Sequence, residues 1–217
     1  MRTVIFDLDN TLVEFVNAKR RACEEVAKLV GSDGEELFSY FLRGKGFESC
    51  ENIADYLKDR GVYSEELYEV AAELYEETKL RELKVYDGVF ELLEELKKRG
   101  LKLCVVTDAD RENAERRLRK AGIIGYFDLI VTFDDTGRKK PDPAPLELAL
   151  RKLGCRPEDA ILVGDSGGRD VEAGKKLGIT TVHATYGCWK IEECRADFSI
   201  SSPLELLEII EGKKEKR

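Results

Sequence analysis

Short apolar runs alternate with amphipathic segments along most of the chain, and this alternation predicts strands and helices in turn. The apolar runs predict strands at Val4–Phe6, Leu101–Val106, Phe127–Thr132, Ala160–Val163 and Ile179–His183, with Ser199–Ile200 as a last edge strand. Apolar residues at helical spacing predict helices at Val89–Arg99, Asn113–Ala121, Pro145–Leu153, Asp170–Leu177 and Pro203–Ile210. This order is typical of an α/β fold, a Rossmann-like parallel sheet with helices on both faces.

The stretch after the first strand has a different pattern, because only helical spacing occurs there. Helices are predicted at Phe15–Val30, Glu35–Leu42 and Asn52–Lys58, and Ser64 is placed to cap a fourth one. Ser32 or Asp33 can cap the second helix. We therefore predict a core domain made of residues 1–13 and 84–217, with an inserted all-helical cap domain at residues 14–83.

Composition narrows the classes of partner. The chain has 217 residues, 42% of them hydrophobic and 37% charged, with a formal net charge of −8. An acidic protein is a poor partner for nucleic acid, although a local basic pocket can still bind a small phosphorylated substrate. No apolar run reaches membrane-spanning length and no signal peptide is evident, so we expect no membrane association and a cytoplasmic location.

The positions of the cysteines indicate the redox state of their thiols, and the low content of Asn and Gln indicates the kind of organism from which the protein comes. The six cysteines are scattered, without a C-x-x-C pair, which favours free structural thiols over a metal site. Cys104 lies in an apolar run and is expected to be buried. A Cys188–Cys194 disulfide is the alternative. Absence of Gln, scarcity of Asn and abundance of Lys and Glu favour a thermophilic source, in which such a bond is more plausible.

Two acids, Asp7 and Asp9, follow the first predicted strand with one residue between them. Acids this close at the end of a buried strand repel each other and lose solvation, so a compensating charge is required. Mg²⁺ suits such oxygen-only ligands. Taken alone, the pair is explained equally well by solvated loop acids.

Polar residues follow other predicted strands as well, and ligands of parallel sheets bind at that edge. The hydroxyl of Thr107 can donate a hydrogen bond to an anion, although helix capping explains a threonine there equally well. Lys140 precedes a proline and can hold a positive charge over an anion, but a solvated basic turn is the simpler explanation in isolation. Asp165 and Asp170 flank a glycine-rich turn, which a helix cap alone does not explain.

The ordered set resembles the haloacid dehalogenase-like hydrolase superfamily. Asp7-Leu8-Asp9-Asn10-Thr11 matches its D-x-D-x-T motif, Thr107 its second motif and Lys140 its third, while Asp165 with Asp170 matches its fourth. The helical insert after the first motif resembles the small cap of the subfamily that includes phosphoglycolate phosphatases and β-phosphoglucomutase.

The resemblance implies a role for each matching residue. Asp7 is the expected nucleophile, forming an aspartyl phosphate, and Asp9 the general acid and base. Mg²⁺ is expected on Asp7, the backbone carbonyl of Asp9 and Asp165, with Asp170 either as a further ligand or as an acid just outside the ligand set. Thr107, Lys140 and backbone N–H groups near Leu8, Asp9 and Asp108 are expected to hold the phosphate oxygens. An acid at position 9 favours phosphoryl transfer over carbon–halogen cleavage, because dehalogenases of the family lack it.

The cap and the reaction class leave alternatives open. Arg43 and Lys45, in a glycine-flanked loop, either contact the substrate or are ordinary surface charges. The favoured function is a Mg²⁺-dependent phosphatase of a small metabolite of the phosphoglycolate or sugar phosphate type. A phosphomutase and a non-catalytic binding protein are the alternatives. The oligomeric state is open between monomer and homodimer, and His183 is expected to have a structural role in its strand.

Overall fold

The computed structural model describes residues 2–190 and 193–212, and the chain divides into two compact units. The core comprises residues 1–14 and 85–217, and the cap comprises residues 15–84. The cap is therefore one continuous stretch of chain inserted between two pieces of the core.

The core is built on a parallel sheet whose order among the described residues is β3-β2-β1-β4-β5-β6. The strands are Thr3–Phe6 (β1), Lys102–Val106 (β2), Leu129–Val131 (β3), Ala160–Gly164 (β4), Thr180–Ala184 (β5) and Phe198–Ile200 (β6). β1 and β4 are buried along their whole length, as expected for central strands of a sheet covered on both faces. The predicted parallel α/β fold is confirmed.

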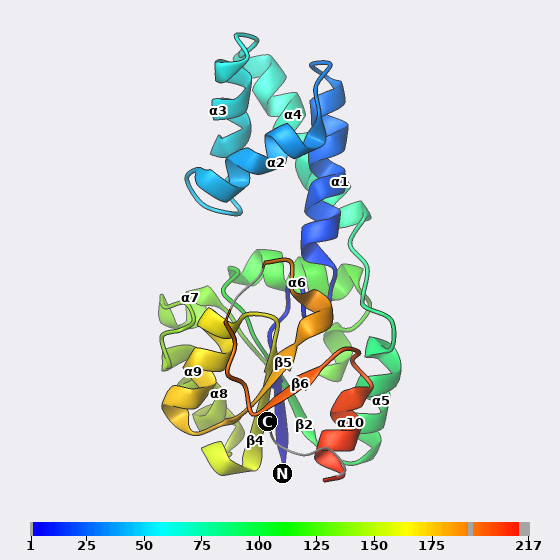
Figure 1. The fold of residues 1–217 in the computed structure, drawn as a ribbon, viewed down its shortest axis with the longest axis vertical. Helices are drawn as coiled ribbons and strands as arrows, with labels where there is room; N and C mark the ends of the chain where they lie inside the picture. Colours follow the sequence, from blue (N-terminus) through cyan, green and yellow to red (C-terminus); the bar gives the residue numbers. More distant parts are fainter. Residues whose placement is uncertain (1, 191–192, 213–217) are drawn as a thin grey trace. The chain divides into compact units, whose positions relative to one another are not determined.

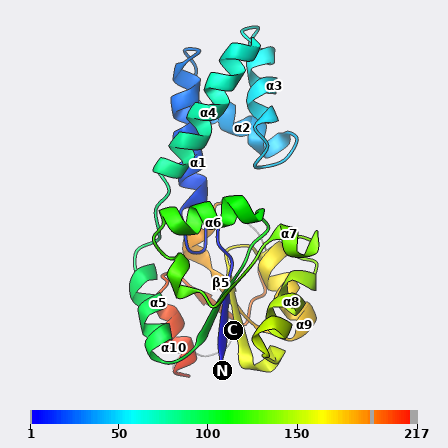
Figure 2. The same ribbon diagram turned by 180° about the vertical axis from the view of Figure 1, so that it is seen from behind.

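Helices cover both faces of this sheet. Figures 1 and 2 show α5 (Val89–Lys98) and α10 (Glu205–Ile210) on one side, with α8 (Ala144–Leu153) and α9 (Glu172–Leu177) on the other. The α8 side packs Leu146 and Ala149 into one apolar cluster with strand residues such as Ile5, Cys104 and Leu162. The core also contains α6 (Arg111–Lys120), α7 (Phe133–Thr136) and the short turns η1 (Ile124–Tyr126), η2 (Pro157–Asp159) and η4 (Thr185–Gly187). No helix among the described residues is long and apolar enough to cross a membrane.

The helix predicted from Asp170 begins differently from the prediction. A π-helical turn, η3 (Gly167–Val171), precedes α9, so Asp170 lies inside a wide turn instead of at the first residue of an α-helix. Glycine at position 167 leaves room for this turn. A Cβ there would lie only 2.8 Å from the carbonyl oxygen of Glu193, which is too close for a residue with a side chain. The periodicity of apolar residues predicts the helix but not this local widening.

Four helices form the cap: α1 (Phe15–Lys28), α2 (Gly34–Arg43), α3 (Glu51–Asp59) and α4 (Glu65–Arg81). The side chain of Asp33 caps α2 by accepting the N–H of Glu35 at 2.8 Å, and Ser64 caps α4 by accepting the N–H of Leu67 at 3.1 Å. Both caps stabilise N–H groups that have no partner within the helix.

A lysine lies in the interior of the cap. Lys19 is fully buried; its ammonium hydrogen-bonds the hydroxyl of Tyr75 and lies 3.6 Å from the ring centroid of Phe41. Burial, together with the positive charge of Lys79, lowers the pKa of Lys19 to about 7. The cap therefore encloses a cation that contacts aromatic faces, an arrangement that partly replaces lost hydration.

Candidate active site

Three of the predicted site residues follow neighbouring strands. Asp7 comes directly after β1, Thr107 after β2 and Asp165 after β4, and β1 lies between the other two strands. The three strands are in register up to the last residue of β1. Because carboxyl ends of parallel strands meet at one edge of the sheet, these side chains lie together.

Lys140 joins this group from the segment before α8. Its Nζ donates to Oδ1 of Asp7 at 2.6 Å and to the carbonyl oxygen of Val106 at 2.9 Å, and it lies 2.7 Å from Oδ1 of Asp170. Burial alone would favour the neutral amine, but the carboxylates of Asp170 and Asp7 outweigh it and raise the pKa of Lys140. The ammonium is therefore a fixed positive charge between two carboxylates.

Asp7, Asp165 and Asp170 form a buried acidic cluster, in which one oxygen from each residue lies within 4.8 Å of the others. Oδ1 of Asp165 is buried and accepts no hydrogen bond from any described residue. Burial, opposed by Lys140, raises the pKa of Asp7 to about 7, and burial with the charge of Asp7 raises that of Asp165 to about 8. A divalent cation would relieve this repulsion, and three carboxylates suit Mg²⁺, so the residues fit such an ion.

The carboxylate of Asp9 has another partner. Nη1 of Arg117, from α6, donates to Oδ2 of Asp9, and both side chains are largely buried, with exposed fractions of 4% for Arg117 and 17% for Asp9. The metal contact predicted for Asp9 uses its backbone carbonyl and stays a prediction.

Thr107 and Asp108 shape the turn after β2. The hydroxyl of Thr107 accepts the N–H of Ala109 at 3.2 Å, and Oδ1 of Asp108 accepts the backbone N–H of Lys140 at 2.9 Å. The other oxygen of Asp108 accepts from Nη1 of Arg169 at 3.3 Å. The hydrogen bond from the backbone N–H of Lys140 attaches Lys140 to this turn. Phosphate binding by Thr107, Lys140 and the N–H of Asp108 stays a prediction.

Arg117 and Arg169 were missed by the sequence reasoning. A signal for Arg117 exists, because it shares one helical stripe with Ala114, Leu118 and Ala121, all of them buried. A charged residue on an apolar stripe indicates a buried partner. Arg169 gives no comparable signal, since it lies in a short glycine-rich turn.

The two cap residues predicted for substrate specificity have partners within the cap. The guanidinium of Arg43 lies 4.4 Å from the ring centroid of Tyr40. The ammonium of Lys45 lies 3.3 Å from a carboxylate oxygen of Glu51 and 3.6 Å from one of Asp55. A role in substrate binding stays a prediction for both.

The cysteines are free thiols, so the Cys188–Cys194 disulfide considered above is wrong. The thiol of Cys188 instead donates to the carbonyl oxygen of Asp165 at 3.1 Å and lies 2.9 Å from Nε2 of His183. Nε2 of His183 lies 3.0 Å from the same carbonyl. His183 is a strand residue, as expected, and with Cys188 it holds the backbone of the Asp165 loop.

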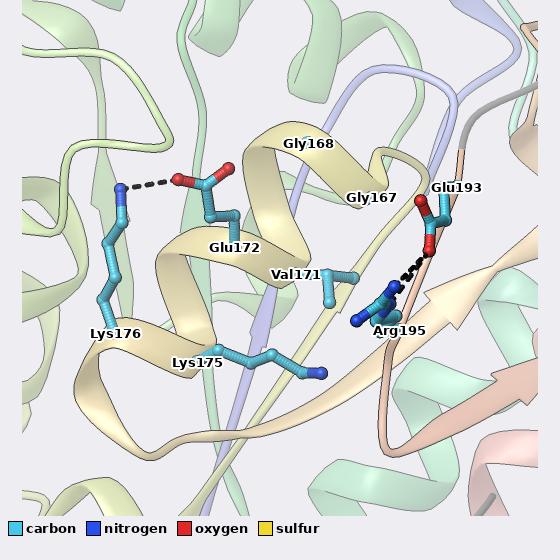
Figure 3. A pocket seen from close by; sticks show the side chains of 8 residues that line it. All are labelled: Gly167, Gly168, Val171, Glu172, Lys175, Lys176, Glu193 and Arg195. Carbon is cyan, nitrogen blue, oxygen red and sulfur yellow. Dashed lines mark hydrogen bonds and ion pairs between the residues drawn. The ribbon is translucent and has the colours of Figure 1, made fainter.

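A surface pocket beside η3 and α9 does not contain the acidic cluster. Figure 3 shows its lining, which consists of Gly167, Gly168, Val171, Glu172, Lys175, Lys176, Glu193 and Arg195. Lys176 pairs with Glu172 at 2.8 Å and Arg195 with Glu193 at 2.7 Å. Because acids neutralise two of its three cations, we do not place the candidate active site there.

The chain matches a known protein family. Residues 4–184 match the family model described as haloacid dehalogenase-like hydrolase. The chain therefore belongs to the haloacid dehalogenase-like hydrolase family. This match spans all four motifs recognised in the sequence.

Related proteins narrow the class. The chain is 35% identical over 216 residues to the phosphoglycolate phosphatase of Aquifex aeolicus, covering 98% of each chain. It is 30% identical over 227 residues to the glyceraldehyde 3-phosphate phosphatase of Methanocaldococcus jannaschii, covering 99% of each. The expected class, a phosphatase of this family related to phosphoglycolate phosphatases, is confirmed.

A solved structure has the same fold. The magnesium-bound crystal structure of YfnB from Bacillus subtilis matches with a TM-score of 0.76 at 22% identity, covering 97% of this chain and 98% of that one. At this level of identity the likeness concerns the fold.

Proposed function

We propose that the protein is a Mg²⁺-dependent phosphatase of a small phosphorylated metabolite and that it works through an aspartyl phosphate on Asp7. The observation that carries this proposal is the position of Lys140, whose ammonium bridges Asp7 and Asp170 beside Asp165. The ammonium of Lys140 and the guanidinium of Arg169, which lies 3.6 Å from Oδ1 of Asp165, offset only two of the three buried carboxylates, so an excess of negative charge remains. A divalent cation matches that excess, and the related fold of YfnB holds magnesium.

The residues that would hold Mg²⁺ are Asp7, Asp165 and Asp170, together with the backbone carbonyl of Asp9. When bound, the ion offsets the charge of the phosphoryl group as it approaches a carboxylate.

The chain's own residues supply the remaining chemistry. The free carboxylate oxygen of Asp7 attacks phosphorus, and the bond between phosphorus and the ester oxygen breaks as the aspartyl phosphate forms. Lys140 favours the ionised form of Asp7 and, with the hydroxyl of Thr107 and nearby backbone N–H groups, binds the phosphate oxygens. Asp9 gives a proton to the leaving alkoxide and later takes one from the water that hydrolyses the aspartyl phosphate.

Two of the relatives support a substrate class. Their names specify two small organic phosphates, phosphoglycolate and glyceraldehyde 3-phosphate. We therefore propose a substrate of the phosphoglycolate or sugar phosphate type.

The test measures phosphate release from a panel of such metabolites, with Mg²⁺ and after its removal by EDTA. Asp7→Asn should abolish turnover, because an amide is a poor nucleophile. Asp87→Asn, at an exposed position of the core, is the matched control and should leave turnover unchanged. Acid quenching followed by mass spectrometry should locate a phosphoryl group on Asp7 of the wild-type protein.

Three results would contradict the proposal: turnover that survives Asp7→Asn, turnover that is indifferent to EDTA, or no phosphate release across the panel. Formation of an isomeric sugar phosphate in excess of inorganic phosphate would instead identify a phosphomutase.

A further inference from the structure

Arg117 is buried in the core although it belongs to none of the recognised motifs. Within the described part of the core, the charged side chains that are buried are Asp7, Lys140, Asp165, Asp170 and Arg117. The first four form the acidic cluster with its ammonium. Burying a charge costs several kcal/mol unless the charge is paired, so the position of Arg117 requires an explanation of its own.

Its ion pair with Asp9 explains the burial of Arg117. Asp9 is the one motif carboxylate that does not belong to the acidic cluster. The guanidinium of Arg117 donates to Oδ2 of Asp9 across 108 residues of sequence. The backbone around Asp9 is itself fixed: Asn10 has a φ of 61°, and its N–H donates to the carbonyl oxygen of Val13 at 2.7 Å. With the backbone held, the ion pair determines the direction of the Asp9 carboxylate.

Helix α6 is a rigid support for this contact. Its N-terminus is capped by Asp110, which accepts the N–H of Asn113 at 2.8 Å. Arg111 attaches the same end to α7, with Nη2 lying 2.6 Å from Oδ2 of Asp135 and its N–H donating to Asp134 at 2.9 Å. An arginine on a fixed helix presents planar donors in one orientation, which a flexible lysine does not do as well.

We propose that Arg117 is a positioning residue that orients Asp9 for proton transfer to and from the substrate. This inference rests on the proposed function, in which Asp9 is the general acid and base. Proton transfer requires hydrogen-bond geometry in the transition state, and a displacement of about 1 Å can reduce a rate by about 100-fold. Arg117 would supply this geometry without touching the reacting atoms.

The test compares two leaving groups, because only one of them needs a proton. The alkoxide of an alkyl phosphate leaves slowly unless it is protonated, whereas the phenolate of p-nitrophenyl phosphate leaves unaided. For Arg117→Met we expect kcat/KM for the best alkyl phosphate to fall by about 100-fold, and that for p-nitrophenyl phosphate by less than about threefold. Arg117→Lys should recover part of the loss. Arg116→Met, at the exposed neighbouring position, is the matched control.

Asp9→Asn separates this inference from the proposed function. If Asp9 is the acid, that variant should lose alkyl phosphate turnover selectively, and adding Arg117→Met to it should cause no further selective loss. Equal losses for both esters in Arg117→Met, or a selective loss that adds fully to that of Asp9→Asn, would overturn the role of Arg117. Absence of selectivity in Asp9→Asn would overturn the proposed role of Asp9 instead. If Arg117→Met does not fold, the leaving-group comparison in Arg117→Lys decides in the same way.

Discussion

The α-carbon of Gly164 faces the carboxyl group of Asp170 without room for a side chain between them. A Cβ at position 164 would lie 2.4 Å from Cγ of Asp170. Gly164 is the last residue of β4 and directly precedes Asp165. The contact of Gly164 with Asp170 therefore places Asp170 next to the backbone that carries Asp165. The absence of a side chain at Gly164 therefore determines how closely Asp170 approaches the strand.

Gly164→Ala should displace Asp170 and weaken the cluster. We expect the Mg²⁺ concentration for half-maximal activity to rise by about tenfold or more, because metal affinity depends strongly on ligand placement. Gly125→Ala is the control, since a Cβ there meets nothing within 4 Å. A variant at position 164 with the wild-type Mg²⁺ dependence would show that Asp170 is not required for the ion.

Lys140→Met should abolish activity and destabilise the core. It removes a cation that holds Asp7, and the loss of one phosphate-binding donor typically costs about 100- to 1,000-fold in turnover. The carboxylates left behind are buried without their partner, which costs about 3–5 kcal/mol in the free energy of unfolding. Lys139→Met, at the exposed neighbouring position, should change neither quantity much. Kinetics and urea unfolding of the two variants provide the comparison, and near-normal turnover in Lys140→Met would contradict the assignment.

Lys19 gives the stability of the protein a predictable dependence on pH. Its pKa falls from 10.5 to about 7 on folding, so the unfolded chain binds more protons than the folded one between these values. Burial of Lys19 is therefore most destabilising below pH of about 7, and the cost disappears as the pH rises toward 10.5.

Lys19→Met should consequently be more stable than wild type at low pH and lose that advantage at high pH. We expect a gain of about 2 kcal/mol at pH 6, after allowance for the hydrogen bond lost by Tyr75, and a loss of about 2 kcal/mol near pH 10, where the folded wild type holds a neutral lysine at little cost and the variant still lacks that hydrogen bond. Urea unfolding of the full chain at several pH values measures this. Lys28→Met, in the exposed last turn of the same helix, should show no such dependence. A gain that does not vary with pH would contradict the protonation argument.

The thiols provide a separate test of the structure. In the denatured protein, six thiols should react with Ellman's reagent without prior reduction. In the native protein Cys188 is exposed and should react quickly, whereas Cys23 and Cys104 are buried and should be protected. Mass mapping of a labelled digest identifies the sites, and a Cys188–Cys194 peptide pair in it would contradict the free-thiol assignment.

Much of the core could be predicted because short apolar runs and glycine punctuation define its strands. The run before Asp7 and the run before Asp165 both predict buried strands, and β1 pairs with β4 in the structure. The convergence of the polar residues that follow is then a property of parallel sheets. These steps need only local sequence and one general rule of topology.

Residues whose role depends on distant partners could not be predicted in this way. The contact between Arg117 and Asp9 requires α6 to lie against the loop after β1, which local periodicity does not specify. Lys19 is similar: it shares a helical stripe with buried Cys23 and Val26, but the aromatic rings around it come from α2 and from the loop that follows α2. The wide turn at Asp170 depends on packing against a segment more than twenty residues later.

The strand order has a consequence for how the protein is made. β1 precedes both strands that flank it in the sheet, because Thr3 pairs with Lys102 on one side and with Ala160 on the other. The cap is contiguous at residues 15–84, so its helices leave the ribosome as a set while β1 still lacks both neighbours. Asp170 emerges only after both partner strands. The acidic cluster around Asp7 is therefore assembled late in translation, after the whole of the cap has been synthesised.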